Sequence, residues 1–330
     1  MYFLLGISLI LTFILIVNLG VGAAASMIWR AIESRVASLS PSTQARVIIG
    51  LRIMPVAFAL VFVLAFVVPS YLLLEPNDSG EVVSLKMAII ALASTLAVLV
   101  AVSRVLRTWF VTNRLLKNWL ADAEPLVIGG IRGRVYRIEH QFPVIGVIGV
   151  FRPRVFVANS VLSALDESEL AAAIDHENGH RAAYDNLKRG VLRACRDLLI
   201  LPIGNRLDRA WAETAETAAD EYAAARNKAA ALDLASALVK IGKLVPHGLT
   251  PALPAGAYLV EDGDDISSRV TRLISISEHP GLATPGTLLS RFTSCVGVAA
   301  ILVILVLPLV DSSVLHGTHT VVETLVAALQ

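Results

Sequence analysis

The sequence predicts a mainly α-helical membrane protein, with four transmembrane helices and a soluble α+β domain between the third and the fourth. Three observations support this fold class. The chain of 330 residues is 55% hydrophobic with a mean hydropathy of +0.69, which is more apolar than usual for soluble domains. Its apolar residues gather in four long runs, and the longest segment with ordinary charge lies between the last two runs. The net charge of +1 predicts no direct nucleic-acid binding.

Each of the four apolar runs is long enough to cross a bilayer, which takes about 20 helical residues. The runs cover residues 2–29, 53–74, 87–103 and 292–310. Charged residues bound the third and fourth runs, as expected where a helix leaves the hydrocarbon.

The distribution of basic residues predicts how the chain is oriented, because Lys and Arg gather on the cytosolic side of a membrane. The first two runs are joined by a loop rich in Arg, whereas the next loop is acidic and no Lys or Arg follows the fourth run. The central segment also opens with basic residues, namely Arg104, Arg107, Arg114 and Lys117. We therefore expect a multi-pass protein of the plasma or inner membrane, with both termini outside and the central segment in the cytosol.

These features divide the chain into four parts. Residues 1–103 hold three transmembrane helices with short loops, and residues 104–290 form the cytosolic domain. Residues 291–311 form the fourth transmembrane helix, and residues 312–330 form a short extracytoplasmic tail.

The first half of the central segment has the character of strands. Residues 135–138, 144–150 and 155–158 are rich in Val and Ile and are separated by Gly and Pro, which predicts a small antiparallel sheet. Such a sheet either covers the core or pairs at its edge with an extended substrate backbone. The sequence leaves both roles open.

A helix with a well-marked start follows the sheet. Asp166 and Glu169 have the spacing of a capping box, and we expect the helix to run from there to about Lys188. Gly179 lies in its middle, where glycine costs about 1 kcal/mol relative to Ala. Either another element packs closely there, or the position is simply tolerated.

This helix contains HENGH, which matches the HExxH pattern of zinc metallopeptidases. His176 and His180 lie one turn apart on one face, so that two imidazoles can bind one zinc ion. Glu177 is rotated by about 100° from His176 and can act as a general base on a water molecule at the metal. The pattern thus predicts a zincin-like metallopeptidase domain.

A catalytic zinc ion usually takes three protein ligands, so one more ligand must come from elsewhere. The preferred candidate is Glu216, in the sequence ETAAD on a helix expected over residues 207–238. Asp220 lies four residues further on the same face, where it can accept a hydrogen bond from a ligand histidine and orient it. Glu213 is the alternative third ligand.

The quoted motifs resemble those of the BlaR/MecR-type membrane zinc metallopeptidases, and the HtpX and CAAX-prenyl protease group shares a related two-helix signature. The likeness rests on HENGH, on RAAYDNLKR after it, on ETAADEYAA downstream and on RPRVFVANSVLSAL upstream, and it spans about residues 135–274. In the BlaR/MecR family three membrane spans precede the protease domain and a fourth follows it, which is the order expected here.

The resemblance implies zinc ligands at His176, His180 and Glu216, a catalytic base at Glu177 and an outer carboxylate at Asp220. It also implies regulated cleavage of a cytosolic protein, such as a transcriptional repressor. BlaR/MecR sensors carry a penicillin-binding domain after the fourth span, whereas about twenty residues remain here, so we do not expect this chain itself to sense penicillin.

The main hypothesis is therefore a membrane-anchored zinc endopeptidase that cleaves a cytosolic or membrane-proximal protein or peptide and uses one zinc ion. Two alternatives stay open. The first is a membrane quality-control metalloprotease with broad specificity. The second is a membrane scaffold without catalytic activity, in which four closed protein ligands hold a structural zinc ion. The sequence indicates neither the oligomeric state nor the activating signal.

Overall fold

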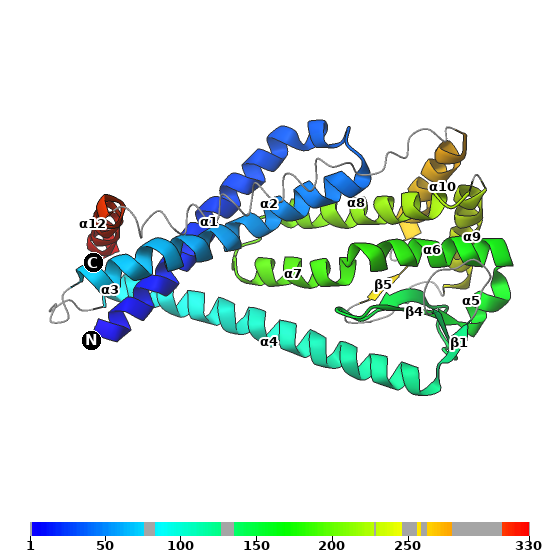
Figure 1. Cartoon of the computed structure of the whole chain (residues 1–330), viewed down its shortest axis with the longest axis horizontal. Helices are drawn as coiled ribbons and strands as arrows, with labels where there is room; N and C mark the ends of the chain where they lie inside the picture. Colours follow the sequence, from blue (N-terminus) through cyan, green and yellow to red (C-terminus); the bar gives the residue numbers. More distant parts are fainter. Residues whose placement is uncertain are drawn as a thin grey trace.

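The molecule is an elongated helical wedge, with long apolar helices towards one end and a small sheet at the other (Figure 1). The structure is a computed structural model. It describes residues 2–75, 83–126, 135–227, 229–245, 256–258, 263–278 and 312–329. The two ends of the described chain lie at the same end of the wedge (Figure 1).

Three long helical segments are apolar enough to cross a membrane, and they correspond to the first three predicted spans. The first is α1 (Tyr2–Val36), and the third is α4 (Leu85–Asp122). The second covers Pro41–Leu74 and consists of α2 (Pro41–Phe62), the π-helical turn η1 (Val63–Val67) and α3 (Val68–Leu74). The predicted fourth span, 292–310, lies outside the described residues.

The apolar helices pack through one core cluster near the chain ends. Leu5 and Phe13 of α1 pack there with Val67 and Met87, and many other apolar side chains face outward, as expected for helices in lipid. The predicted tail forms a helix, α12 (Ser312–Leu329), which joins this cluster. The Ser84 hydroxyl donates a hydrogen bond to the carbonyl of Leu329 at 2.7 Å, which ties α12 to the start of α4.

The sheet is mixed, so the prediction of an antiparallel sheet was wrong. Its five strands have the order β1-β2-β4-β3-β5. They are β1 (Glu124–Leu126), β2 (Val135–Ile138), β3 (Ile145–Ile148), β4 (Arg154–Ala158) and β5 (Gly256–Tyr258). All pairs are antiparallel except β2 with β4.

The parallel pair arises because the chain crosses over β4 between β2 and β3. β3 and β4 form a tight hairpin. In its turn Gly149 has a φ of 109°, and a Cβ atom there would lie 3.2 Å from the carbonyl oxygen of Arg152. β3 therefore lies on the far side of β4 from β2, and β2 and β4 run in the same direction. The alternation of apolar and polar residues along a strand does not determine which strand pairs with it, so the sequence did not predict the parallel pair.

Helices cover the sheet and build a second hydrophobic core with it. They are α5 (Asn159–Ala164), α6 (Glu167–Ala183), α7 (Asp185–Asp197), α8 (Asn205–Ala224), α9 (Ala230–Leu244) and α10 (Gly263–Glu278). The core lies between the sheet, α6 and α9, and it buries Val155, Ile174 and Leu238 completely.

The helix predicted over 207–238 is in fact two helices, α8 and α9. The Asn227 side chain accepts hydrogen bonds from the backbone N–H groups of Ala229 and Ala230, at 3.0 and 2.8 Å. This local bonding competes with helix continuation and starts a new helix in another direction. As a result α9 packs against α6 and the sheet.

Candidate metal centre

The start of α6 is fixed as the sequence predicts. The Asp166 side chain accepts from the N–H of Glu169 at 2.9 Å, and Glu169 accepts from the N–H of Asp166 at 3.0 Å. Glu169 also accepts from Ser236 at 2.5 Å and from Lys240 at 2.6 Å, both on α9. The capping box therefore fixes the helix start and also joins α6 to its neighbour.

The end of α6 comes earlier than predicted, at Ala183 instead of about Lys188. Tyr184 adopts the left-handed conformation with a φ of 56°, and α7 begins at the next residue. The turn lets Asp185 point back, so that its Oδ2 accepts from His180 Nδ1 at 2.8 Å. A continuous helix would carry Asp185 around to another face.

The close approach of α6 and α8 explains the glycine in the middle of α6. A Cβ atom at Gly179 would lie 3.1 Å from the Cα of Ala219 and 3.2 Å from the Cβ of Tyr222. A side chain at this position would require α8 to shift by a few tenths of an ångström. The contact at Gly179 therefore fixes the distance between α6 and α8 beside His180.

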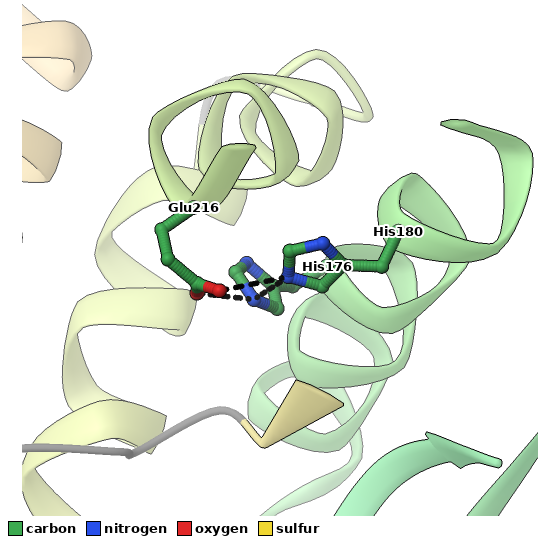
Figure 2. A group of neighbouring side chains, drawn as sticks. All are labelled: His176, His180 and Glu216. Atoms are coloured by element: carbon green, nitrogen blue, oxygen red, sulfur yellow. Dashed lines mark hydrogen bonds and ion pairs between the residues drawn. The ribbon is translucent and has the colours of Figure 1, made fainter. Parts of the chain in front are cut away.

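Across this contact three side chains meet, as Figure 2 shows: His176 and His180 from α6 and Glu216 from α8. The two Nε2 atoms are 3.2 Å apart. Glu216 Oε2 lies 3.5 Å from His176 Nε2, and Glu216 Oε1 lies 3.4 Å from His180 Nε2. Glu213, the alternative third ligand, is exposed and not part of this group.

These separations suit a tetrahedral metal ion. Zinc bonds to His nitrogen and carboxylate oxygen are about 2.0–2.2 Å long, which places neighbouring ligand atoms of a tetrahedron about 3.3–3.6 Å apart. The two Nε2 atoms are 3.2 Å apart, and each lies 3.4 or 3.5 Å from a different oxygen of Glu216. One ligand atom from each residue can be chosen so that all three lie within 4.8 Å of one another. Two imidazoles and one carboxylate are also a ligand set found in catalytic zinc sites. The triad could therefore hold a metal ion.

Glu177 has an unusual environment for a carboxylate. It is completely buried, and within the described part of the chain neither of its oxygens has a hydrogen-bond partner. Burial raises the pKa of this carboxyl to about 7, against the opposing influence of His176 and His180. A group that titrates near neutral pH can take up and release a proton during a reaction.

Each histidine of the triad is held from behind by a carboxylate. His176 Nδ1 donates to Asp220 Oδ1 at 2.9 Å, as His180 Nδ1 does to Asp185. With both Nδ1 protons placed there, the Nε2 lone pairs are left for a metal. Burial opposes a charge on His180, but Glu216 and Asp185 raise its pKa to about 10, so these carboxylates favour a cation at this place.

Basic residues surround the carboxylates. Arg269 of α10 donates to Asp220 Oδ1 at 2.7 Å and lies 3.4 Å from Glu216 Oε2, and Arg272 lies 3.3 Å from Asp220 Oδ2. Burial would raise the pKa of Asp220, but His176 and Arg269 lower it to about 2. Arg189 donates to Glu216 Oε1 at 3.1 Å. The carboxylates are therefore charged at neutral pH.

Sequence reasoning missed four of these residues: Asp185, Arg189, Arg269 and Arg272. The sequence contains a signal for only one of them, because an Asp a few residues after HExxH can turn back if the helix ends early. Arg189 lies on α7, whereas Arg269 and Arg272 both lie on α10, and no local pattern relates these arginines to the motif. Only the tertiary packing of α7, α8 and α10 brings them to the centre.

The edge of β3 that faces away from β4 is already paired with another strand. This pairing bears on whether the sheet only covers the core or also binds an extended substrate backbone. β5 pairs antiparallel with β3 along that edge, opposite β4. A substrate strand would therefore pair with β3 only in place of β5. The amide of Asn186 donates to the carbonyls of Val147 and Gly149, at 2.9 and 3.1 Å, and holds β3 beside the start of α7.

No protein-family model matches the chain, and a search of curated proteins finds no significant match. The resemblance to the BlaR/MecR-type metallopeptidases stays a prediction from the motifs.

Proposed function

We propose that the chain is a membrane-anchored, zinc-dependent endopeptidase that cleaves a cytosolic or membrane-proximal protein. The observation that carries this proposal is the convergence of His176, His180 and Glu216 around a space of zinc dimensions, with Glu177 buried and unpartnered beside them within the described residues. Three helices apolar enough to span a bilayer support the membrane anchor.

A bound zinc ion would act as a Lewis acid on the scissile carbonyl and would lower the pKa of a neighbouring water to about 7. Glu177 accepts the proton of the attacking water, since it is completely buried beside the triad and neither of its oxygens has a hydrogen-bond partner among the described residues. It then delivers the proton to the leaving amine. Asp220 and Asp185 keep the Nδ1 protons of the two histidines in place during both steps.

A purely structural zinc site is less well supported, since it needs a fourth protein ligand. Asp220 is the nearest further candidate, but its oxygens are bonded to His176 and to the guanidinium groups of Arg269 and Arg272. This bonding favours three protein ligands and a fourth position for substrate or water, as in catalytic sites.

The substrate class rests on the motif resemblance. The BlaR/MecR-type motifs imply one cytosolic protein cleaved on a signal, for example a transcriptional repressor, and a quality-control protease with many substrates is the alternative. The membrane anchor restricts either activity to proteins that approach the bilayer.

The test is a comparison of three purified forms: wild type, Glu177→Gln and Glu213→Gln. Each is loaded with zinc and incubated with a proteome-derived peptide library, and new peptide termini are counted by mass spectrometry. We expect Glu177→Gln to bind zinc normally and to lose cleavage by about a thousandfold, since general acid–base catalysis contributes roughly 10²–10⁴-fold. Glu213 is exposed and lies outside the triad, so its variant should keep full activity. Undiminished cleavage by Glu177→Gln would refute the mechanism.

A further inference from the structure

A cavity lies between the end of α1 and the start of α8, apart from the metal centre. Its volume is about 520 Å³. Polar and basic side chains of both helices line it, namely Ser26, Trp29, Arg30, Asn205, Arg206 and Arg209. None of them takes part in the proposed peptidase chemistry.

The cavity has an excess of positive charge. Arg206 is paired with Glu33 at 2.6 Å, and the nearby Asp208 is bonded by Arg52 at 2.7 Å. Arg30 and Arg209 have no ion-pair partner among the residues that the structure describes. Two positive charges at its wall therefore lack a counter-charge from that part of the protein.

Hydrogen-bond donors without acceptors point to the same kind of ligand. Helix α8 has 20 residues and begins after Gly204, whose φ is 92°, with no side chain capping its first N–H groups. Such a helix start favours a bound anion. The buried Trp29 Nε1 and Ser26 Oγ also lack a hydrogen-bond partner in the described structure.

The cavity lies at the depth where lipid headgroups are expected. Arg30 is the first charged residue of α1, and it follows the apolar run 2–29. At 1.5 Å per residue this run is roughly 40 Å long, about the thickness of a bilayer that includes its polar headgroup regions. Trp residues also concentrate at this boundary.

We propose that this cavity binds a phosphate group, and that the group belongs to an anionic phospholipid of the adjacent leaflet. Arg30 and Arg209 neutralise its charge, and the first N–H groups of α8 donate hydrogen bonds. Glu216 lies on the same helix, about two turns beyond Arg209. The bound lipid would therefore fix the start of the helix that supplies the third metal-binding side chain.

The test uses the full chain purified in a zwitterionic detergent. Native mass spectrometry measures binding of phosphatidylglycerol, of phosphatidylcholine and, in a separate arm, of inorganic phosphate. The variant is Arg30→Gln with Arg209→Gln. The matched control is Arg35→Gln with Arg46→Gln, which removes the same charge from exposed positions that do not line the cavity. Zinc content and circular dichroism verify that all forms are folded.

We expect wild type and control to prefer phosphatidylglycerol over phosphatidylcholine, and the Arg30/Arg209 variant to bind it about 30-fold more weakly. This estimate follows from a roughly fivefold gain in affinity for each basic side chain near an anionic surface. Another outcome is that inorganic phosphate binds as tightly as phosphatidylglycerol and loses its binding in the Arg30/Arg209 variant. That result would support a phosphate site but contradict a phospholipid as its ligand. Equal phosphatidylglycerol binding by variant and control, or no preference over phosphatidylcholine, would overturn the proposal.

Discussion

The two histidines of the candidate metal centre are each hydrogen-bonded to a carboxylate, but the two supports are built differently. His180 is held by Asp185, which is five residues away and contacts Lys188 at 3.1 Å. His176 is held by Asp220 on another helix, which is bonded by Arg269 from a third. One support is local and depends on a single turn of backbone. The other exists only when three helices have packed, so the two should respond differently to mutation.

The largest difference is expected between Asp220→Asn and Asp185→Asn. Loss of an outer carboxylate typically weakens metal binding by about 10–100-fold. Asp220→Asn should lie at the upper end and should also destabilise the fold by about 3–5 kcal/mol, because it leaves Arg269 buried without its strongest partner. Asp185→Asn should weaken zinc binding by about tenfold with a smaller loss of stability. Competition with a chelator gives the affinities, and thermal unfolding in detergent gives the stabilities.

Equal effects of the two variants on zinc affinity and on stability would mean that the contact of Asp220 with His176 contributes no more than the contact of Asp185 with His180. A further variant sharpens the comparison. Glu213→Gln changes an exposed carboxylate on the same helix as Asp220 and should leave both quantities unchanged.

Glu169 combines a local and a long-range contact, and it gives a pH-dependent prediction of intermediate size. Burial alone would raise its pKa, but bonds from Lys240, Ser236 and the N–H of Asp166 lower it below the usual 4.5. Its stabilising contribution is therefore present above pH 4.5 and is lost as the pH falls through the lowered value. Glu169→Gln should cost about 1–3 kcal/mol at pH 7.

The measurement is the difference in thermal unfolding between wild type and Glu169→Gln at pH 7 and again near pH 3. We expect the gap to narrow as the pH falls through the lowered pKa of Glu169, because protonated Glu169 resembles the Gln variant. A gap that is independent of pH would show that the ion pair with Lys240 contributes nothing to stability.

The smallest effect is expected for Lys188→Ala, which removes the ion pair between Lys188 and Asp185. The Lys188 side chain is 27% exposed, and pairs of this kind usually contribute less than about 1 kcal/mol. Thermal stability and zinc affinity should both stay close to wild type. A loss comparable to that of Asp220→Asn would show that the local support is coupled to the metal as strongly as the long-range one.

The contrast between local and long-range contacts also explains what the sequence could predict. The first three apolar runs, the capping box of Asp166 and Glu169 and the HExxH spacing are local patterns, and the described structure contains each of them, whereas the fourth run lies outside the described residues. The preference for Glu216 over Glu213 also followed from a local pattern, the Asp four residues on. These features follow from helix geometry and helix ends alone.

The features that sequence reasoning missed depend on neighbours in space. The parallel pairing of β2 with β4 follows from a crossover. The early end of α6 at Tyr184 requires a left-handed residue that is not glycine, and such positions carry no reliable sequence signal. Arg269 reaches the centre only through the packing of α10, 49 residues beyond Asp220 in the chain.

The most direct measurement is the zinc content of the detergent-purified chain after incubation with zinc and removal of weakly bound ions. We predict about one zinc ion per wild-type chain and per Glu213→Gln chain, and only background levels for His176→Ala and for Glu216→Gln. Equal zinc in all four proteins, or none in the wild type, would contradict the metal centre on which the proposed peptidase activity depends.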